Sequence, residues 1–249
     1  MQADPAYRLL VLDGSLVRWA MPPSQRVTTV TYAYLQKAAD FRDTHNCGRM
    51  LPPDAALAAS KVKTSTFRRE VRAAFDMWEA AANIRFLETS NVGEAGILIG
   101  AEAEPRGRAF TNVAPHAGSG RTVSDIAQSL ICLNPATPWK VGFDGNLDVY
   151  DLRYTMAHEI GHAIGLDHPS AEGQLMSYRY VESGRALTPG DIAGAVALYG
   201  APQRQGVARD VAGLNSRTLP RGAERNALPP GGAPFGLGDA EKLRAAPPR

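Results

Sequence analysis

Residues 158–168 contain the side chains of this chain that are best suited to chemistry. They read His-Glu-Ile-Gly-His-Ala-Ile-Gly-Leu-Asp-His, the pattern H-E-x-x-H-x-x-G-x-x-H with every position filled. On a helix His158 and His162 are about one turn apart, so both imidazoles point from one face toward the same place. Gly165 can adopt a positive φ, which lets the chain turn back and bring His168 to that place. Three imidazoles and one open position are what a catalytic zinc ion requires.

The full pattern is much more specific than a lone H-E-x-x-H. The chain has five histidines, and three of them lie in this motif. A glycine and a third histidine at fixed offsets argue against coincidence. Glu159 lies beside the first histidine, where it can reach a water on the metal without being a ligand. We therefore predict a zinc site at His158, His162 and His168, with Glu159 as the general base of a hydrolysis.

The bulk composition excludes several other classes of protein. A chain of 249 residues forms one large domain or two small ones, and 44% hydrophobic with 21% charged residues is typical of a globular core. The net charge of +2, without a basic run interleaved with aromatics, argues against nucleic acid as a partner. No apolar run is long enough to span a membrane.

The N-terminus bears on the compartment. The residues Met-Gln-Ala-Asp-Pro-Ala-Tyr have no charged region followed by an apolar stretch, so the chain as given carries no signal peptide. Either the protein is cytosolic or the numbering begins after a removed leader, and both alternatives stay open.

The two cysteines, Cys47 and Cys132, lie far apart and form no C-x-x-C pair, which excludes a cysteine zinc site. In an exported protein they are most simply one disulfide closing a long loop. Two unpaired buried thiols are the alternative.

Strands and helices are expected to alternate along the chain. The apolar positions Phe67, Val71, Phe75 and Trp78 follow the three-to-four spacing of one buried helix face. The expected elements are a strand at 27–35, a long loop at 42–63, a helix at 65–82, and short strands at 84–88, 96–100, 109–113 and 130–133.

The helix that carries the motif is expected to begin at Asp148 as N-cap, with Asp151 at N3, and to end near Ile164. Residues 144–148, Asp-Gly-Asn-Leu-Asp, begin like a calcium loop. The glycine and glutamate required further along such a loop are missing, which favours a turn leading into the helix cap.

A last helix is expected to start at Thr188 as cap, with Pro189 at N1 and Asp191 at N3, and to close at Gly200. Residues 201–249 are rich in proline, glycine and arginine. That composition cannot bury enough surface to offset chain entropy, so we predict a disordered tail.

This order of elements, together with the motif, resembles the metzincin zinc endopeptidases. Metzincins place a methionine beneath the zinc in a "Met-turn", and Met176 within Gln-Leu-Met-Ser-Tyr is the matching residue. Residues 187–200 resemble the closing segment of matrixins and serralysins, and the likeness extends over roughly residues 19–200. It implies an α+β fold: a twisted, mostly parallel sheet packed with a long helix and the zinc-binding helix, then a small C-terminal subdomain. The implied division is an extension at 1–26, a catalytic domain at 27–200 and the tail.

Two residues depart from the usual matrixin pattern. Pro169 stands where matrixins usually have serine, and Tyr178 stands where they usually have proline; both look serralysin-like. In serralysins and astacins this tyrosine can ligate zinc and stabilise the transition state, which implies a catalytic role for Tyr178. The alternative is that Tyr178 only packs in the turn. The calcium-binding repeats of serralysins are absent, and His116 stands alone without a second zinc site, so the closest resemblance is to a bacterial matrixin.

The resemblance also bears on the cysteines and on the compartment. A matrixin "cysteine switch" lies before the first strand, whereas Cys47 follows it, so a Cys47–Cys132 disulfide is favoured over a switch. The likeness implies secretion and allows calcium elsewhere in the domain. The implied function is that of a zinc endopeptidase acting through Glu159, a monomer whose partner is a protein or peptide substrate. The alternatives are a serralysin-type domain without its repeats and a non-catalytic zinc-stabilised binding module.

Overall fold

A twisted sheet with helices on one face forms the framework of the protein. The computed structural model describes residues 6–103, 107–116 and 122–203. Its elements are β1 (Arg8–Leu9), β2 (Val11–Leu12), β3 (Ser15–Arg18), β4 (Thr28–Tyr34), β5 (Ala39–Asp40), β6 (Arg49–Leu51), α1 (Asp54–Leu57), α2 (Thr64–Ala81), β7 (Ile84–Glu88), β8 (Ile97–Glu102), β9 (Ala109–Pro115), β10 (Val123–Leu133), β11 (Trp139–Lys140), β12 (Tyr150–Asp151), α3 (Leu152–Ala163), β13 (Leu166–Asp167) and α4 (Pro189–Tyr199).

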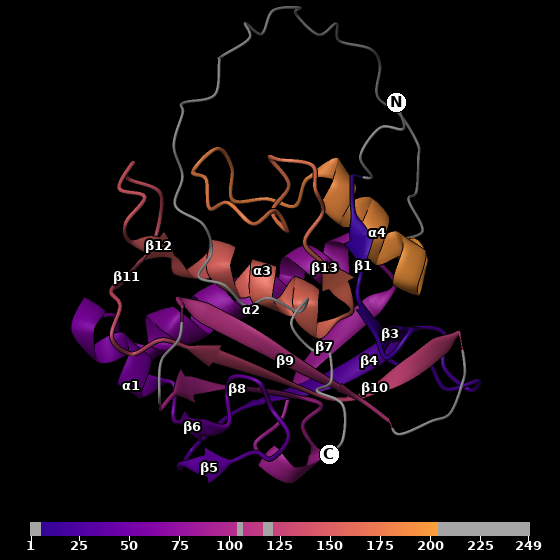
Figure 1. The fold of residues 1–249 in the computed structure, drawn as a ribbon, viewed down its shortest axis with the longest axis horizontal. Coiled ribbons are helices and arrows are strands. Elements are labelled where there is room, and N and C mark those ends of the chain that lie inside the picture. Colours follow the sequence, from indigo (N-terminus) through magenta and orange to yellow (C-terminus); the bar gives the residue numbers. More distant parts are fainter. Residues whose placement is uncertain (1–5, 104–106, 117–121, 204–249) are drawn as a thin grey trace, which may run out of the picture.

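Most strands of the main sheet run parallel, as predicted. In the described residues the sheet has nine strands, ordered β2-β3-β10-β8-β4-β7, with β9 antiparallel along β10 and with β6 and β5 beyond β8. The pairs β10–β3, β10–β8, β4–β8 and β4–β7 are parallel. Helices α2 and α3 lie side by side over one face, and α4 lies near the end of α3 (Figure 1). The expected α+β fold is confirmed.

Helix α2 presents one apolar face to the core. Phe67, Val71, Phe75 and Trp78 are all fully buried, which confirms the predicted stripe. The indole Nε1 of Trp78 donates a hydrogen bond of 2.9 Å to Ala157 O in α3. This bond joins the two helices at the centre of the domain, next to the motif.

Two expectations about local structure are wrong. Helix α3 begins after Asp151, whose carboxylate accepts from Tyr154 N at 2.9 Å, and Asp148 lies outside the helix. The helix cannot start earlier because residues 150–151 are extended and pair with β11. The expected loop at 42–63 contains β6 and α1, since Pro52 and Pro53 stand directly before the first turn of α1, where proline is tolerated.

The N-terminal segment is packed against the domain. Strand β1 pairs with β13 next to the motif, and the β2–β3 hairpin extends the sheet along β10. The Trp19 Nε1 donates to Ala163 O at 2.9 Å. The expected extension at 1–26 thus supplies, from residue 6 onward, strands that pair with β13 and β10, and Trp19 bonds to the motif helix. The expected disordered tail lies outside the described residues from 204 onward.

None of the described helices has the length and apolar character needed to cross a bilayer. The last helix, α4, begins with Pro189 after Thr188 and has a capping box with Asp191, as predicted.

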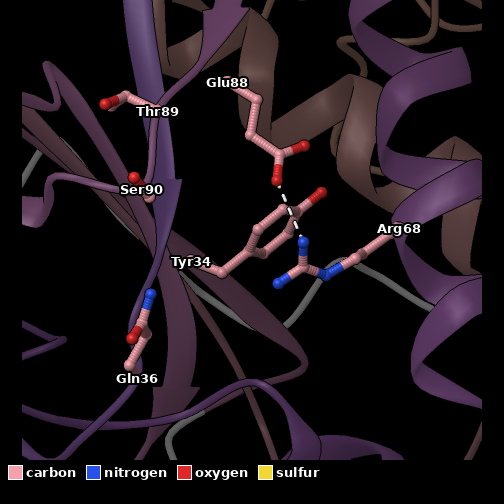
Figure 2. A pocket seen from close by; sticks show the side chains of 6 residues that line it. All are labelled: Tyr34, Gln36, Arg68, Glu88, Thr89 and Ser90. Carbon is pink, nitrogen blue, oxygen red and sulfur yellow. Dashed lines mark hydrogen bonds and ion pairs between the residues drawn. The ribbon is translucent and has the colours of Figure 1, made fainter.

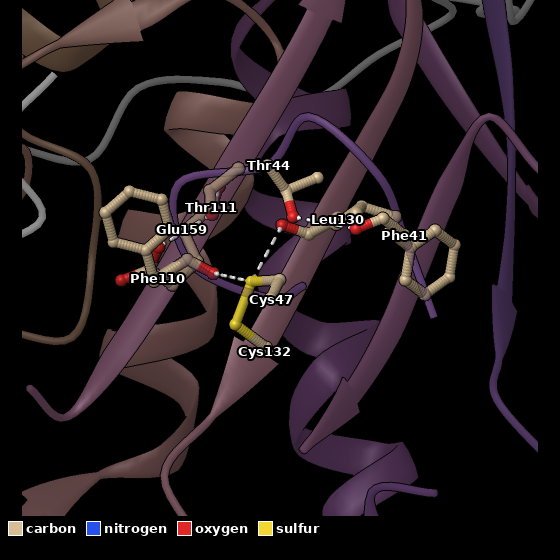
Figure 3. Close-up of a disulfide and its surroundings, with 8 residues drawn as sticks. All are labelled: Phe41, Thr44, Cys47, Phe110, Thr111, Leu130, Cys132 and Glu159. Atoms are coloured by element: carbon tan, nitrogen blue, oxygen red, sulfur yellow. Dashed lines mark hydrogen bonds between the residues drawn. A yellow bond between two sulfur atoms is a disulfide. The ribbon is translucent and has the colours of Figure 1, made fainter. Parts of the chain in front are cut away.

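Cys47 and Cys132 form the predicted disulfide, with Cα atoms 5.7 Å apart (Figure 3). Cys47 precedes β6 and Cys132 lies near the end of β10, so the bridge joins the connection after β4 to the centre of the sheet. The alternative of two free thiols is wrong.

We predict that opening this disulfide destabilises the protein markedly. The bridge closes a separation of 85 residues, for which chain entropy gives about 4–5 kcal/mol. Urea unfolding of the Cys47→Ser, Cys132→Ser double variant measures the loss. An intact mass about 2 Da below the reduced formula identifies the bridge in the parent. A double variant as stable as the parent would contradict the prediction.

Candidate metal centre and active site

The three motif histidines converge on one point. His158 and His162 come from α3, and His168 follows β13. Their Nε2 atoms are 3.0 Å apart between His158 and His168, and 3.1 Å apart in the other two pairs. Gly165 makes the return possible: its φ is +101°, and an added Cβ would lie 2.2 Å from Val17 O. The residues that the sequence predicts as ligands are therefore brought together.

Backbone carbonyls fix which nitrogen of His158 and of His162 faces the centre. His158 Nδ1 lies 2.8 Å from Leu175 O, and His162 Nδ1 lies 2.9 Å from Leu166 O. Because a carbonyl oxygen can only accept, each Nδ1 carries the proton and each Nε2 presents a lone pair. Lone pairs this close repel one another unless a cation lies between them.

Zinc fits this donor set. Tetrahedral coordination with Zn–N bonds of about 2.0–2.1 Å places ligand nitrogens about 3.3 Å apart, close to the spacing seen here. Burial, together with His162, lowers the pKa of His158 well below its usual value. Burial and the neighbouring histidines lower the pKa of His168 as well. These two rings are therefore neutral, which is the form that binds a metal ion. In the described residues, His158, His162 and His168 are the one group of three or more histidine, cysteine or acidic side chains that could hold a metal ion.

Glu159 is buried beside the ligands. Its side chain is 3% exposed, and its Oε2 accepts a hydrogen bond of 2.6 Å from Thr111 Oγ1 in β9. Burial raises the pKa of Glu159 above its ordinary value. His162 and the Thr111 hydroxyl oppose this shift without reversing it. Thr111 was not predicted to belong to the site, because no local pattern relates two residues so far apart in the sequence.

Met176 forms a buried floor beneath the motif helix. It is 2% exposed, and its Sδ would lie 2.2 Å from a Cβ added at Gly161 of α3. Only a residue without a side chain at position 161 lets the methionine approach the helix this closely.

A single buried carboxylate holds the turn around Met176. Asp191, in the first turn of α4, accepts hydrogen bonds from Leu175 N at 2.9 Å, Met176 N at 3.0 Å and Thr188 N at 2.8 Å. Leu175 O in turn accepts from His158 Nδ1. The carboxylate thus connects the last helix to the first candidate ligand through one residue of the turn.

Tyr178 lies against His168, with ring centroids 4.0 Å apart and an interplanar angle of 34°. Its ring therefore covers one side of the third candidate ligand. This contact agrees with packing in the turn and also keeps the tyrosine near the reacting centre.

The calcium-like segment 144–148 is organised by a lysine. The ammonium of Lys140 contacts the carboxylates of Asp144 and Glu182 and donates 2.7 Å to Asn146 O. Glu182 Oε2 accepts from Gly145 N at 2.7 Å. An amine of this chain thus occupies the oxygen cluster, and nothing in the described residues favours calcium there.

A hollow lies at the carboxyl ends of β4 and β7 (Figure 2). Arg68 and Glu88 form an ion pair of 3.0 Å across it, and the Arg68 guanidinium lies 4.5 Å from the Tyr34 ring centroid. The ion pair already joins its two charged side chains. The strand order puts β7 several strands away from β9, so this hollow is separate from the metal centre.

Comparison with known proteins identifies relatives of this chain. The matrixin (Peptidase_M10) family model matches residues 55–200. Interstitial collagenase of Sus scrofa is 31% identical over 139 residues, covering 53% of this chain and 28% of the relative. Karilysin of Tannerella forsythia is 25% identical over 150 residues, covering 58% and 31%. Metalloendoproteinase 1-MMP of Arabidopsis thaliana is 33% identical over 152 residues, covering 58% and 39%. The chain thus spans less than two-fifths of each of these relatives.

We predict that Asp191→Asn destabilises the protein by about 2–4 kcal/mol, because hydrogen bonds to a buried charge are among the strongest and an amide presents a donor to backbone N–H groups. Thermal unfolding monitored by circular dichroism measures the change. Asp125→Asn, at an exposed position of β10, is the matched control. If both variants melt at the parent temperature, Asp191 does not hold the turn.

Proposed function

The chain belongs to the matrixin family, and on this premise we propose that it is a zinc endopeptidase that hydrolyses peptide bonds in proteins or peptides. The observation that carries the proposal is the convergence of three histidine Nε2 atoms beside the buried carboxylate of Glu159. The matrixin match also favours this family over the serralysin-type alternative.

We propose that His158, His162 and His168 hold the zinc ion through Nε2. A bound zinc ion polarises the substrate carbonyl and increases the acidity of a water molecule. The protein contributes rigidity: Leu175 O and Leu166 O orient the first two rings, and Met176 packs beneath the helix. Hydrogen bonds to the ligand side chains fix the orientation of the rings and raise the affinity for the metal.

Glu159 is proposed to be the general base. Its carboxylate takes a proton from the attacking water and then gives that proton to the leaving amine. Its position next to His158 in the helix places it at the metal centre without making it a ligand. The non-catalytic alternative gains no support, since the glutamate and all three histidines are present.

Strand β9 is proposed to align the substrate. Among the described strands it pairs with β10 alone, so its other edge has no strand partner there, and α3 contacts it. An extended peptide can add to such an edge through main-chain hydrogen bonds. We further propose that the protein is secreted, because a disulfide is most stable in an oxidising compartment. We also propose that it is a monomer.

We predict that Glu159→Ala retains zinc but loses peptidase activity by about a hundredfold or more, because the proton transfer loses its base. Casein cleavage and bound zinc are measured on the same preparation. Glu172→Ala, an exposed glutamate, is the control. A Glu159→Ala protein that cleaves casein at the parent rate would sink the assignment.

Tyr178 is proposed to assist through its hydroxyl. The Tyr178→Phe variant keeps the ring against His168 and removes only the oxygen, so kcat should fall about tenfold or more if the hydroxyl stabilises the transition state. Steady-state kinetics on a peptide substrate measure this. Unchanged turnover would assign Tyr178 to packing alone.

A further inference from the structure

The carboxylate of Glu159 has a hydrogen-bond donor outside the motif. Thr111 Oγ1, on β9, lies 2.6 Å from Glu159 Oε2 (Figure 3). In the part of the chain that the structure describes, this is the hydrogen bond that the buried carboxylate makes. A carboxylate that is 3% exposed needs such a partner, because leaving it without one costs free energy.

The Thr111 hydroxyl has one proton and two acceptors within reach. Oε2 of Glu159 is 2.6 Å away, and the backbone O of the same residue is 3.0 Å away. The shorter contact and the negative charge favour the carboxylate as the acceptor. With Oε2 held in this way, Oε1 is the carboxylate oxygen left to receive a proton.

The position of Thr111 is itself rigidly set. In the β9–β10 ladder Thr111 lies opposite Ile131, and the preceding Phe110 lies opposite Cys132. The disulfide fastens Cys132, and Cys47 Sγ lies 3.6 Å from Phe110 O (Figure 3). A β-branched side chain adds stiffness at χ1. The Thr111 hydroxyl therefore projects toward the carboxylate from β9, a strand that is held by its pairing with the disulfide-linked β10.

We propose that Thr111 is a positioning residue that orients the Glu159 carboxylate for proton transfer. The proposal rests on the proposed role of Glu159 as general base. Thr111 acts through Glu159 and not on the substrate, so its hydroxyl affects turnover and leaves substrate affinity and zinc binding in place.

Steady-state kinetics of two Thr111 variants test the proposal. Thr111→Val keeps the shape of the side chain without the hydroxyl and should lower kcat about tenfold to a hundredfold, with KM within about twofold of the parent. Thr111→Ser restores the hydroxyl and should restore most of kcat. Zinc content should be equal in all of them. Thr44→Val, which removes a threonine hydroxyl in the connection before β6, is the matched control.

A parent-like kcat for Thr111→Val, measured where Glu159→Ala is inactive, overturns the inference and leaves the proposed function intact. The same holds if Thr111→Ser is as slow as Thr111→Val, since the loss would then follow from shape. A parent protein without peptidase activity would instead contradict the proposed function.

A double-mutant cycle supplies a readout that does not depend on activity. Urea midpoints are measured on the zinc-loaded full chain for the parent, Thr111→Val, Glu159→Ala and the double variant. If the hydroxyl serves the carboxylate, Thr111→Val lowers the midpoint of the parent and leaves that of Glu159→Ala unchanged. An equal shift in both backgrounds shows that Thr111 and Glu159 are not coupled, and overturns the inference.

Discussion

The architecture of this protein depends on keeping three imidazole nitrogens about one hydrogen-bond length apart. The backbone enforces this arrangement, and the Nδ1 contacts of His158 and His162 with carbonyl oxygens turn the Nε2 lone pairs of these two rings toward the centre. Helix α3 supplies two of the rings at one-turn spacing. The third is returned by Gly165, a position where Val17 O excludes any side chain. Each contact that fixes a ring or the return of the chain helps to hold the three nitrogens at the spacing that a tetrahedral zinc ion requires.

The strongest of these contacts run through backbone atoms. The N–H of Leu175 donates a hydrogen bond to Asp191, and its carbonyl oxygen accepts one from His158. This one residue therefore links α4 to α3. The Asp191 carboxylate is 1% exposed and receives three backbone N–H groups, which offsets the cost of burying its charge. The closing helix, remote from the histidines in sequence, is thereby part of the metal centre.

The sequence predicts those parts of the site whose information is local. The ligand triad follows from helix spacing and the glycine turn, and the faces of α2 and α4 follow from apolar periodicity and caps. It identifies Asp191 only as an N3 residue, because its bonds to Leu175 and Met176 span a loop. Thr111 and Lys140 are missed for the same reason: a hydroxyl or an ammonium acquires its partner only when distant strands and loops are packed. The sequence places the N-cap of α3 at Asp148, three residues before the observed cap at Asp151. Both acidic residues can cap a helix, and only the pairing of β12 with β11 decides between them.

Buried charges extend the constraint to the other end of the motif helix. Asp151, the fully buried N-cap of α3, pairs with Arg185 at 3.0 Å, and the same guanidinium reaches Glu70 of α2 at 3.0 Å. Arg153 completes the cluster at 2.8 Å from Glu70. Arg185 lies in the segment between Met176 and α4. The buried carboxylates of Asp151 and Glu70 require cationic partners. Arg185 forms an ion pair with both. The start of the motif helix and the segment that follows the methionine turn are therefore held by the same side chain, so both ends of this connection are fixed to the helices that carry the site.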